Sequence, residues 1–556
     1  MIVFLLAGCQ GEAPVPGSGE SGSTGRPNIL LIVVDDMGFS DLGAFGSEIE
    51  TPNLDQLATS GIRLTNFQAA STCSPTRSML LTGVDSHLAG LGNMLEELSP
   101  NQKGQPGYEG FLNDRVVTIA TLLKEAGYRT MMTGKWHLGQ ESSTGPSARG
   151  FEQSFTLVPG GASHFSDMRP AYAPSPEIKA KYRDNGVLLD QLPDGFEYSS
   201  QYYVDRLIHF MSGSMSDDAP FFAYLSFTAP HWPLQAPAEA IEKYRGRYDQ
   251  GYDVLLSERL DRAKQLGVIP ESAEKSPAPF KYKPWDALGD TERQYAARAM
   301  EVYAAMIDEV DRHSGRLFDY LRQTGEFDNT VIVFLSDNGA EGHDLDETWP
   351  ADLFPKIRQT IDESHDFSFD AMGHPGSYVL YGPNWARAGS PAFNLYKAFP
   401  TEGGTRVAAF VHYSEFASDA VMDSPVSVKD LTPTLLELAG VGRPAGEFMG
   451  RPVENISGVS QVGILSGEKA GSADAERVLV NELFGKRSVR RGNWKLTHMP
   501  EPYGNNDWQL FDLAKDIGEA TDIAAGNTGI VKELVAEWQK YADENYVILP
   551  DWVSGY

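Results

Sequence analysis

A short segment of the chain combines a thiol with a nearby positive charge. It reads Cys73-Ser74-Pro75-Thr76-Arg77. Pro75 suits the first turn of a helix and Gly83 suits its end, so the sequence predicts a helix that begins at Cys73. Free N–H groups and the helix dipole favour anions there, and Arg77 adds charge on nearly the same face. We therefore expect Cys73 to be an activated residue facing an anionic group. The alternative is a buried structural cysteine, which is common.

Two acidic clusters follow apolar runs that are typical of strands. Residues 29–34 lead into Asp35-Asp36, and residues 331–335 lead into Ser336-Asp337-Asn338. Unbroken β-branched runs suit strands buried on both faces of a parallel sheet. In α/β folds the polar residues just past such strands line the site. A lone acidic pair is more often a turn or a helix cap, but two strand-end clusters together favour a site.

Helical patterns alternate with these runs. One helix is expected near residues 116–123, closed by Gly127, and a longer one near 303–321, closed by Gly325. The alternation indicates an α/β fold with a large, mixed, mostly parallel sheet flanked by helices.

The C-terminal part differs in character. Residues 487–497 and 508–513 resemble short antiparallel strands, and an amphipathic helix follows near 530–538. We expect a catalytic domain over 27–445 and a smaller α+β subdomain over 446–556.

The net charge restricts the partners. There are 46 Lys and Arg residues against 76 Asp and Glu residues, which gives a formal charge of −30. Such a surface repels nucleic acid and anionic membranes, so neither is expected as a partner. Any anion site must therefore be a local cationic pocket.

The chain has two cysteines, and the first lies in an apolar N-terminal segment. Leu5-Leu6-Ala7-Gly8-Cys9 resembles the lipobox of a bacterial lipoprotein, so residues 1–9 are interpreted as a lipoprotein-type signal with Cys9 lipidated. A basic n-region is missing, and the true start codon is expected upstream. Residues 10–26 suit a flexible tether. We expect a periplasmic or cell-envelope protein; the alternative is a cytoplasmic one.

Several motifs together resemble one enzyme family. The Cys73 segment, with Leu81-Thr82-Gly83, resembles the full signature of type I (formylglycine-dependent) sulfatases, which have the alkaline phosphatase-like fold. Residues 134–139, 228–234 and 395–407 resemble further sulfatase motifs, in the expected order. The resemblance covers residues 27–545. Residues 377–383 and 395–397 bring the chain closest to bacterial arylsulfatases.

The resemblance implies a metal site and a reaction. One Ca²⁺, or alternatively Mg²⁺, would be bound by Asp35, Asp36, Asp337, Asn338 and the modified Cys73. Oxygen-donor side chains of this kind suit a hard cation and argue against Zn²⁺. A maturation enzyme would oxidise Cys73 to formylglycine, and a hydroxyl of the hydrated aldehyde would attack the sulfur of a sulfate ester, most simply an aryl sulfate.

The resemblance also assigns roles to the basic residues. Lys135 and Lys397 would bind the sulfate oxygens. His231, with Lys397, would protonate the leaving oxygen, and His137 would deprotonate the remaining hydroxyl so that sulfate is expelled. Arg77 would hold the aldehyde in place; the alternative role for Arg77 is a structural ion pair only. A monomer is expected.

Other functions stay open at this point. A phosphonate or phosphodiester hydrolase could use the same scaffold, a zinc phosphatase would need His-rich metal positions, and a lipid-anchored binding protein would not need two histidines. A cysteine protease would leave the acidic pairs without a role. The aromatic group of Trp136, His164, Phe165 and Trp232 is interpreted equally well as a pocket for an aryl group or as core.

Overall fold

The computed structural model describes residues 25–213, 219–468 and 476–552. Cys9 and most of the proposed tether lie outside these residues. Within them, no helix combines the length and the hydropathy needed to cross a membrane.

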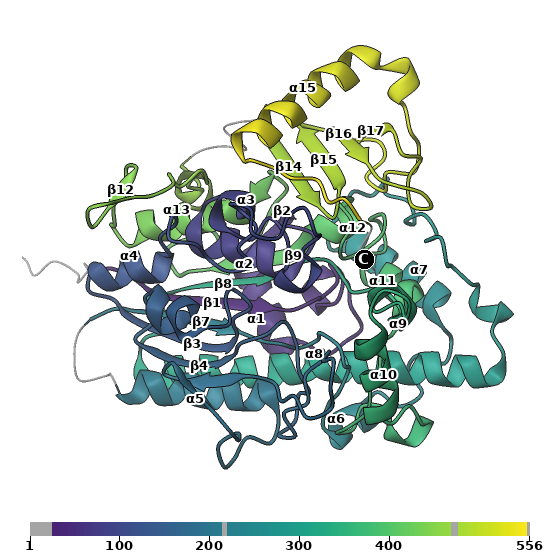
Figure 1. Ribbon diagram of the computed structural model, residues 1–556, viewed down its shortest axis with the longest axis horizontal. Coiled ribbons are helices and arrows are strands. Elements are labelled where there is room, and N and C mark those ends of the chain that lie inside the picture. Colours follow the sequence, from purple (N-terminus) through teal and green to yellow (C-terminus); the bar gives the residue numbers. More distant parts are fainter. Residues whose placement is uncertain (1–24, 214–218, 469–475, 553–556) are drawn as a thin grey trace, which may run out of the picture.

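A large mixed sheet forms the centre of the molecule (Figure 1). Its order is β10-β2-β9-β8-β1-β7-β3-β4-β5-β6, with β11 paired to β2. Strands β8, β1, β7, β3 and β4 are parallel neighbours, whereas β9 runs antiparallel to both β8 and β2. Its strands are β1 (Asn28–Val34), β2 (Ile62–Gln68), β3 (Arg129–Lys135), β4 (Gln153–Leu157), β5 (Tyr182–Asp184), β6 (Val187–Leu188), β7 (Phe221–Ser226), β8 (Thr330–Ser336), β9 (Arg406–His412), β10 (Ala420–Met422) and β11 (Val426–Ser427).

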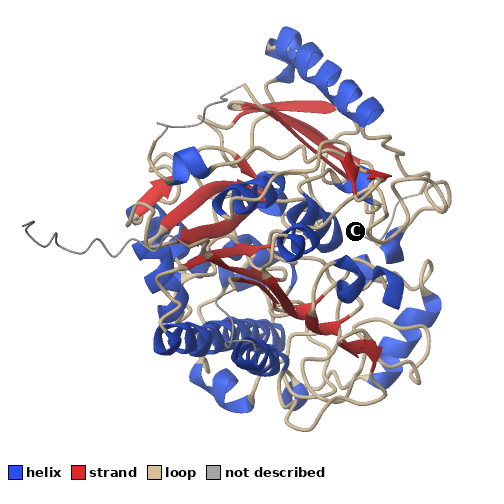
Figure 2. Cartoon of the chain, turned by 90° about the vertical axis from the view of Figure 1, so that its left-hand side faces the viewer, coloured by secondary structure: helices blue, strands red, loops and turns tan. Residues whose placement is uncertain are grey.

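Helices cover both faces of this sheet (Figure 2). On β1, Leu30, Ile32 and Val34 pack into one core, and the alternate residues pack into the other. Both faces of the strand are therefore buried, as the unbroken apolar run predicts. The helices are α1 (Pro52–Ser60), α2 (Cys73–Thr82), α3 (Ser86–Ala89), α4 (Ile119–Glu125), α5 (Ser199–Gly213), α6 (Ala238–Lys243), α7 (Tyr252–Gln265), α8 (Asp290–Thr324), α9 (Leu345–Thr348), α10 (Pro355–Ser364), α11 (Gly382–Gly389), α12 (Glu402–Thr405), α13 (Leu431–Leu438), α14 (Val462–Leu465) and α15 (Thr528–Glu544).

The helix boundaries refine the sequence prediction. Helix α4 begins only at Ile119, because the side chain of Thr118 caps it by accepting the N–H of Thr121. Helix α8 ends at Gly325 as predicted, with φ 78°, but it begins as early as Asp290.

A second, antiparallel sheet follows the large sheet in the sequence. It has the order β14-β15-β16-β17, formed by Val478–Leu483, Lys486–Arg491, Trp494–His498 and Trp508–Asp512. Helix α15 packs on it through Leu534 and Trp538. The predicted strand over 487–497 is thus two strands of a hairpin, and β14 was not predicted. A short hairpin of β12 (Glu447–Phe448) and β13 (Arg451–Pro452) precedes this sheet.

A buried histidine joins helix α3 to the second sheet. His87 of α3 lies between Asp85, 3.0 Å from its Nδ1, and Glu482 of β14, 2.9 Å from its Nε2. Burial alone would lower the pKa of His87, but its hydrogen bonds with Asp85 and Glu482 raise the pKa from 6.5 to about 9. The charged imidazolium therefore stabilises the contact between α3 and the second sheet at neutral pH.

This histidine should make stability depend on pH. Because its pKa is raised on folding, its contribution is fully present below pH 6.5 and is lost as the pH rises through about 9. We expect wild type to lose about 3 kcal/mol of its stability advantage over His87→Gln across that range, measured by urea unfolding. The exposed His209 provides a control, since His209→Gln should keep the wild-type dependence. A constant difference between wild type and His87→Gln would show that His87 is not charged in the folded protein.

Candidate active site

The carboxyl ends of the central parallel strands bring the predicted residues to one edge of the sheet. Asp35 and Asp36 follow β1, Asp337 follows β8, and Lys135 ends β3. The N–H of Asp36 lies 3.3 Å from Oδ1 of Asp337, so the two acidic clusters are in contact. Asp36 has φ 70°, which turns the chain sharply at the end of β1.

Cys73 lies at the start of α2, directed at the acidic residues. The helix begins at Cys73 and ends at Gly83, which has φ 66°, as predicted. The Cys73 Sγ lies 3.2 Å from Oδ1 of Asp35 and 3.8 Å from Oδ1 of Asp36. Burial, with Asp337 and Asp35 nearby, raises the pKa of the thiol well above its ordinary value. These surroundings oppose the thiolate that a cysteine protease needs.

Arg77 is fixed between two strand ends. Its guanidinium is completely buried, and its Nε donates to Oδ2 of Asp337 at 2.8 Å. The same group donates to the hydroxyl of Ser226 at the end of β7. The ion pair that was the structural alternative for Arg77 is therefore present, one helical turn from Cys73.

Both predicted lysines form ion pairs with the aspartates. Lys135 Nζ lies 2.7 Å from Oδ2 of Asp35, and Lys397 Nζ lies 2.9 Å from Oδ2 of Asp36. Burial alone would lower the pKa of Lys135, but Asp35 raises it overall, so this lysine stays charged. A second carboxylate contacts Lys397, since Oε2 of Glu341 lies 3.1 Å from its Nζ.

His231 also faces Asp36. Its Nε2 lies 3.7 Å from Oδ2 of Asp36, and its Nδ1 donates to the carbonyl of Trp232 at 2.6 Å. The carbonyl of His231 itself accepts from Nε2 of His164 at 3.0 Å, so His164 supports this loop. The hydrogen bond at Nδ1 leaves Nε2 as the ring atom directed at the site.

His137 lies in a different environment. Its Nε2 is 3.0 Å from Oε1 of Glu96, which also accepts from the hydroxyl of Tyr172 at 2.9 Å. Among the described residues, no hydrogen bond or ion pair links His137 to the aspartates. Its Nδ1 is buried and has no hydrogen-bond partner.

The donor atoms at the strand ends fit a hard divalent cation. Ligand atoms of Asp35, Asp36, Cys73 and His231 all lie within 4.8 Å of one another. Asn338 donates its amide N–H to Oδ1 of Asp36 at 2.8 Å, but its own buried Oδ1 has no hydrogen-bond partner among the described residues. An unpaired amide oxygen beside crowded carboxylates is the environment that Ca²⁺ or Mg²⁺ would complete. The same grouping places His231 beside the predicted ligands.

Some residues of the site were not predicted. Glu341 follows Asn338 in the same strand-end loop, and Ser226 ends β7, so the strand-end rule would have found both. Glu96 has no such signal, because only the tertiary fold brings it to His137.

Of the four candidate aromatic residues, Trp136, His164 and Trp232 are buried and Phe165 is half-buried. Trp136 is completely buried and packs on Phe151 in the core. Phe165 packs on Tyr198. The ring of Trp232 lies 4.6 Å from that of His231, and its Nε1 has no hydrogen-bond partner. Trp232 is also buried and packs on Tyr172 and Tyr378 in the core, so it borders the site through His231.

Comparisons with known proteins agree with these features. A family model described as Sulfatase matches residues 27–441. The chain is 44% identical over 539 residues to an uncharacterized sulfatase of Schizosaccharomyces pombe, with 95% of each chain covered. It is 38% identical over 449 residues to an arylsulfatase of Klebsiella aerogenes, which covers 80% of this chain and 93% of the relative.

Solved structures show the same fold. Ps i-CgsB, in complex with k-i-k-neocarrahexaose, matches with a TM-score of 0.65 at 23% identity over 95% of both chains. A phosphonate monoester hydrolase of Agrobacterium radiobacter matches with a TM-score of 0.57 at 18% identity, over 94% of this chain and 96% of that one. The predicted α/β fold is thereby confirmed. With the family model matching most of its length, the chain belongs to the sulfatase family of sulfuric ester hydrolases.

Proposed function

We propose that the protein hydrolyses aryl sulfates, using a formylglycine made from Cys73 and one bound Ca²⁺. The observation that carries this proposal is the position of Cys73, whose Sγ lies 3.2 Å from Asp35 in a buried cluster with Lys135, Lys397 and His231. The aryl leaving group is supported by the 38% identity with an arylsulfatase.

The fixed cations bind the sulfate group. Lys135 and Lys397 extend into the site from different parts of the chain, so they can contact different oxygens of one sulfate. Both ammonium groups are almost completely buried, which strengthens their attraction for an anion. Arg77 is held by Asp337 and keeps the start of α2, and with it residue 73, in a constant position. When present, the hydrated formylglycine supplies the hydroxyl that attacks sulfur.

The two histidines move protons at defined atoms. His231 presents Nε2 to the site, since Nδ1 is engaged with the Trp232 carbonyl, so Nε2 donates the proton to the leaving oxygen. His137 has its Nε2 engaged with Glu96, so the unpaired Nδ1 is the atom that takes a proton from residue 73. His231 would donate from its imidazolium form, because Nδ1 keeps its own proton for the Trp232 carbonyl. The Glu96 carboxylate beside Nε2 of His137 supports a protonated Nε2 and thus a proton-accepting Nδ1.

The strand-end oxygens hold the metal. Asp35, Asp36, Asp337 and the unpaired amide oxygen of Asn338 would bind the Ca²⁺, together with residue 73. When bound, the cation supplies a Lewis acid next to the sulfate oxygens. The Asp residues also orient the lysines, so the same carboxylates serve both the metal and the substrate site.

We further propose that Cys9 is lipidated, that the protein is attached to the cell envelope and that it acts as a monomer. The proposed lipobox and the tether of residues 10–26 support the anchor.

Substrate preference tests the function directly. We expect protein purified from its own host to hydrolyse 4-nitrophenyl sulfate with kcat/KM at least about tenfold above that for bis(4-nitrophenyl) phosphate. Mass spectrometry of the peptide carrying Cys73 should show the aldehyde, and Cys73→Ala should abolish turnover. A preference for the phosphodiester would favour the phosphodiesterase alternative, and an unmodified thiol in fully active enzyme would exclude the formylglycine.

The role of His231 predicts a dependence on the leaving group. His231→Asn should lower kcat on phenyl sulfate by about a hundredfold or more, because the phenolate is a poor leaving group and needs a proton. The loss on 4-nitrophenyl sulfate should be smaller. His209→Asn, at an exposed position, serves as the control. Equal losses on both substrates would mean that His231 is not the general acid.

Metal removal should lower both activity and stability. After chelation, the crowded carboxylates lose their counter-charge, so we expect a lower Tm and loss of turnover, both restored by Ca²⁺. At a Ca²⁺ concentration 100-fold above its Kd, the gain in unfolding free energy should be about 3 kcal/mol. Asp337→Asn should lose most of this gain, whereas Asp290→Asn, at an exposed residue, should keep it. A Ca²⁺-independent Tm in wild type would contradict the site.

A further inference from the structure

The segment that carries Lys397 lies against the loops of the other site residues. The N–H of Lys397 donates to the carbonyl of Ala340 at 2.9 Å, and the N–H of Ala398 donates to the carbonyl of Ser71 at 2.7 Å. Gly339 lies so close that a Cβ there would be 1.8 Å from the carbonyl oxygen of Gly403. The backbone around Lys397 is therefore fixed to the loops before Cys73 and after Asn338.

The same backbone is strained. Leu395 has φ 56° and Ala398 has φ 68°, so a left-handed residue lies on each side of Lys397. For residues other than glycine this conformation costs about 1–2 kcal/mol each. Strain of this kind persists only where surrounding contacts enforce it.

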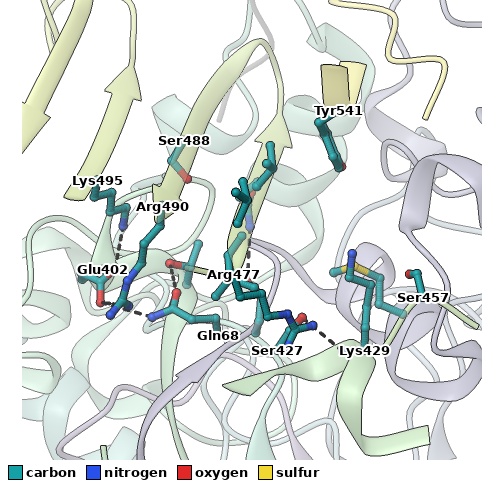
Figure 3. Close-up of a pocket in the computed structure, with 17 residues that line it drawn as sticks. Gln68, Glu402, Ser427, Lys429, Ser457, Arg477, Ser488, Arg490, Lys495 and Tyr541 are labelled. Atoms are coloured by element: carbon teal, nitrogen blue, oxygen red, sulfur yellow. Dashed lines mark hydrogen bonds and ion pairs between the residues drawn. The ribbon is translucent and has the colours of Figure 1, made fainter. Parts of the chain in front are cut away.

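The C-terminal sheet contacts the far end of this segment. The N–H of Glu402 donates to Oε2 of Glu519 at 2.7 Å, and Lys495 of β16 donates to Oε1 of Glu402 at 2.8 Å. Figure 3 shows Lys495 and Arg490 pointing from this sheet toward Glu402. Both sheets therefore hold the segment that carries Lys397.

A cavity of about 170 Å³ lies at this contact (Figure 3). Its four basic side chains are already paired: Lys429 with Asp85, Arg477 with Asp430, and Arg490 and Lys495 with Glu402. The cavity thus offers no free positive charge for an anionic ligand.

Lys486 of β15 contacts the segment directly beside Lys397. Its Nζ donates to the carbonyl oxygen of Ala398 at 3.4 Å and lies 4.1 Å from the ring centre of Phe399. The ring centre of Phe484 lies 5.9 Å from the same Nζ. The side chain is 4% exposed, so the ammonium group is enclosed between aromatic rings and one carbonyl.

Burying a lysine without an ion-pair partner costs free energy, so a lysine in this position is expected to have a specific function. In the described parts of the chain, no ion pair within 4.0 Å includes Lys486. Burial lowers its pKa to about 7, and the attraction of Glu347 and Glu341 only partly offsets this. Methionine would fill similar space without the desolvation penalty, but it could not donate a hydrogen bond to Ala398.

We propose that Lys486 is a positioning residue for Lys397. By donating to the Ala398 carbonyl, it holds the left-handed backbone that directs the Lys397 side chain at Asp36 and at the sulfate group. The C-terminal sheet thereby becomes part of the substrate site without touching the substrate. This inference rests on the proposed function, in which Lys397 binds sulfate.

Three substitutions test the proposal in the mature, full-length enzyme. Lys486→Met should lower kcat/KM for 4-nitrophenyl sulfate about tenfold, mainly through kcat, because Lys397 is misplaced in the transition state. Lys486→Arg, which keeps a donor, should recover part of the loss. Lys429→Met is the matched control, since Lys429 pairs with Asp85 elsewhere at the contact between the sheets, and it should change kcat/KM by less than about twofold.

A double-mutant cycle separates positioning from general destabilisation. In a Lys397→Ala background, Lys486→Met should cause little further loss, because the group it positions is gone. If Lys486→Met lowers activity equally in both backgrounds, or no more than Lys429→Met does in wild type, the proposal is wrong. If Lys486→Met does not fold, Lys486→Gln replaces it in the same cycle.

Crystal structures keep this test independent of the proposed function. If wild type fails to hydrolyse sulfate esters, or if Lys397→Ala is fully active, it is the proposed function that fails. The structure of Lys486→Met then decides the inference. The inference is supported if Ala398 and Lys397 Nζ are displaced in Lys486→Met and neither is displaced in Lys429→Met. It is overturned if the backbone over residues 395–398 is unchanged in Lys486→Met.

Discussion

The site depends on the burial of charged groups at one edge of a sheet, where each must have a partner. Asp35, Asp36 and Asp337 lie almost completely out of water, and they are matched by Lys135, Lys397 and Arg77. An unpaired charge in this position would cost several kcal/mol, so the position of each side chain constrains its partner. The need to pair each buried charge thus holds several parts of the chain together. These parts are the ends of β1, β3 and β8, the start of α2 and the Lys397 segment. That requirement gives the rigidity that binding a tetrahedral anion needs.

The burial of charged groups in the site also explains how an acidic chain can bind an anionic substrate. A formal charge of −30 repels sulfate esters at long range, although salt screens this repulsion beyond about 10 Å. Inside the site the lysines are enclosed, and their interaction with an anion is stronger than at the surface. The carboxylates already present make the pocket less cationic than the sequence suggested. A divalent cation would correct this imbalance, which links metal binding to substrate binding.

The sequence predicts those parts of the site that follow from local rules. The helix that begins at Cys73 and ends at Gly83, and the acidic residues after β1 and β8, were correctly predicted from turn chemistry and apolar runs. Glu96 and Lys486 could not be found in this way. They lie far in sequence from the residues they contact, and neither occupies a helix cap or the end of a parallel strand. Strand β14 was missed because its burial is only partial, which weakens the apolar pattern.

The C-terminal sheet is therefore better understood as support for the site than as an appended unit. Its contacts with the core are buried and charged: His87 with Glu482, Lys495 with Glu402, and Lys486 with the Ala398 carbonyl. Two of these three contacts reach the segment that carries Lys397. Contacts of this kind are less favourable than apolar packing unless they fix a particular geometry. The left-handed backbone at Leu395 and Ala398 is a geometry that needs such support, because neither residue is a glycine that could adopt it without strain.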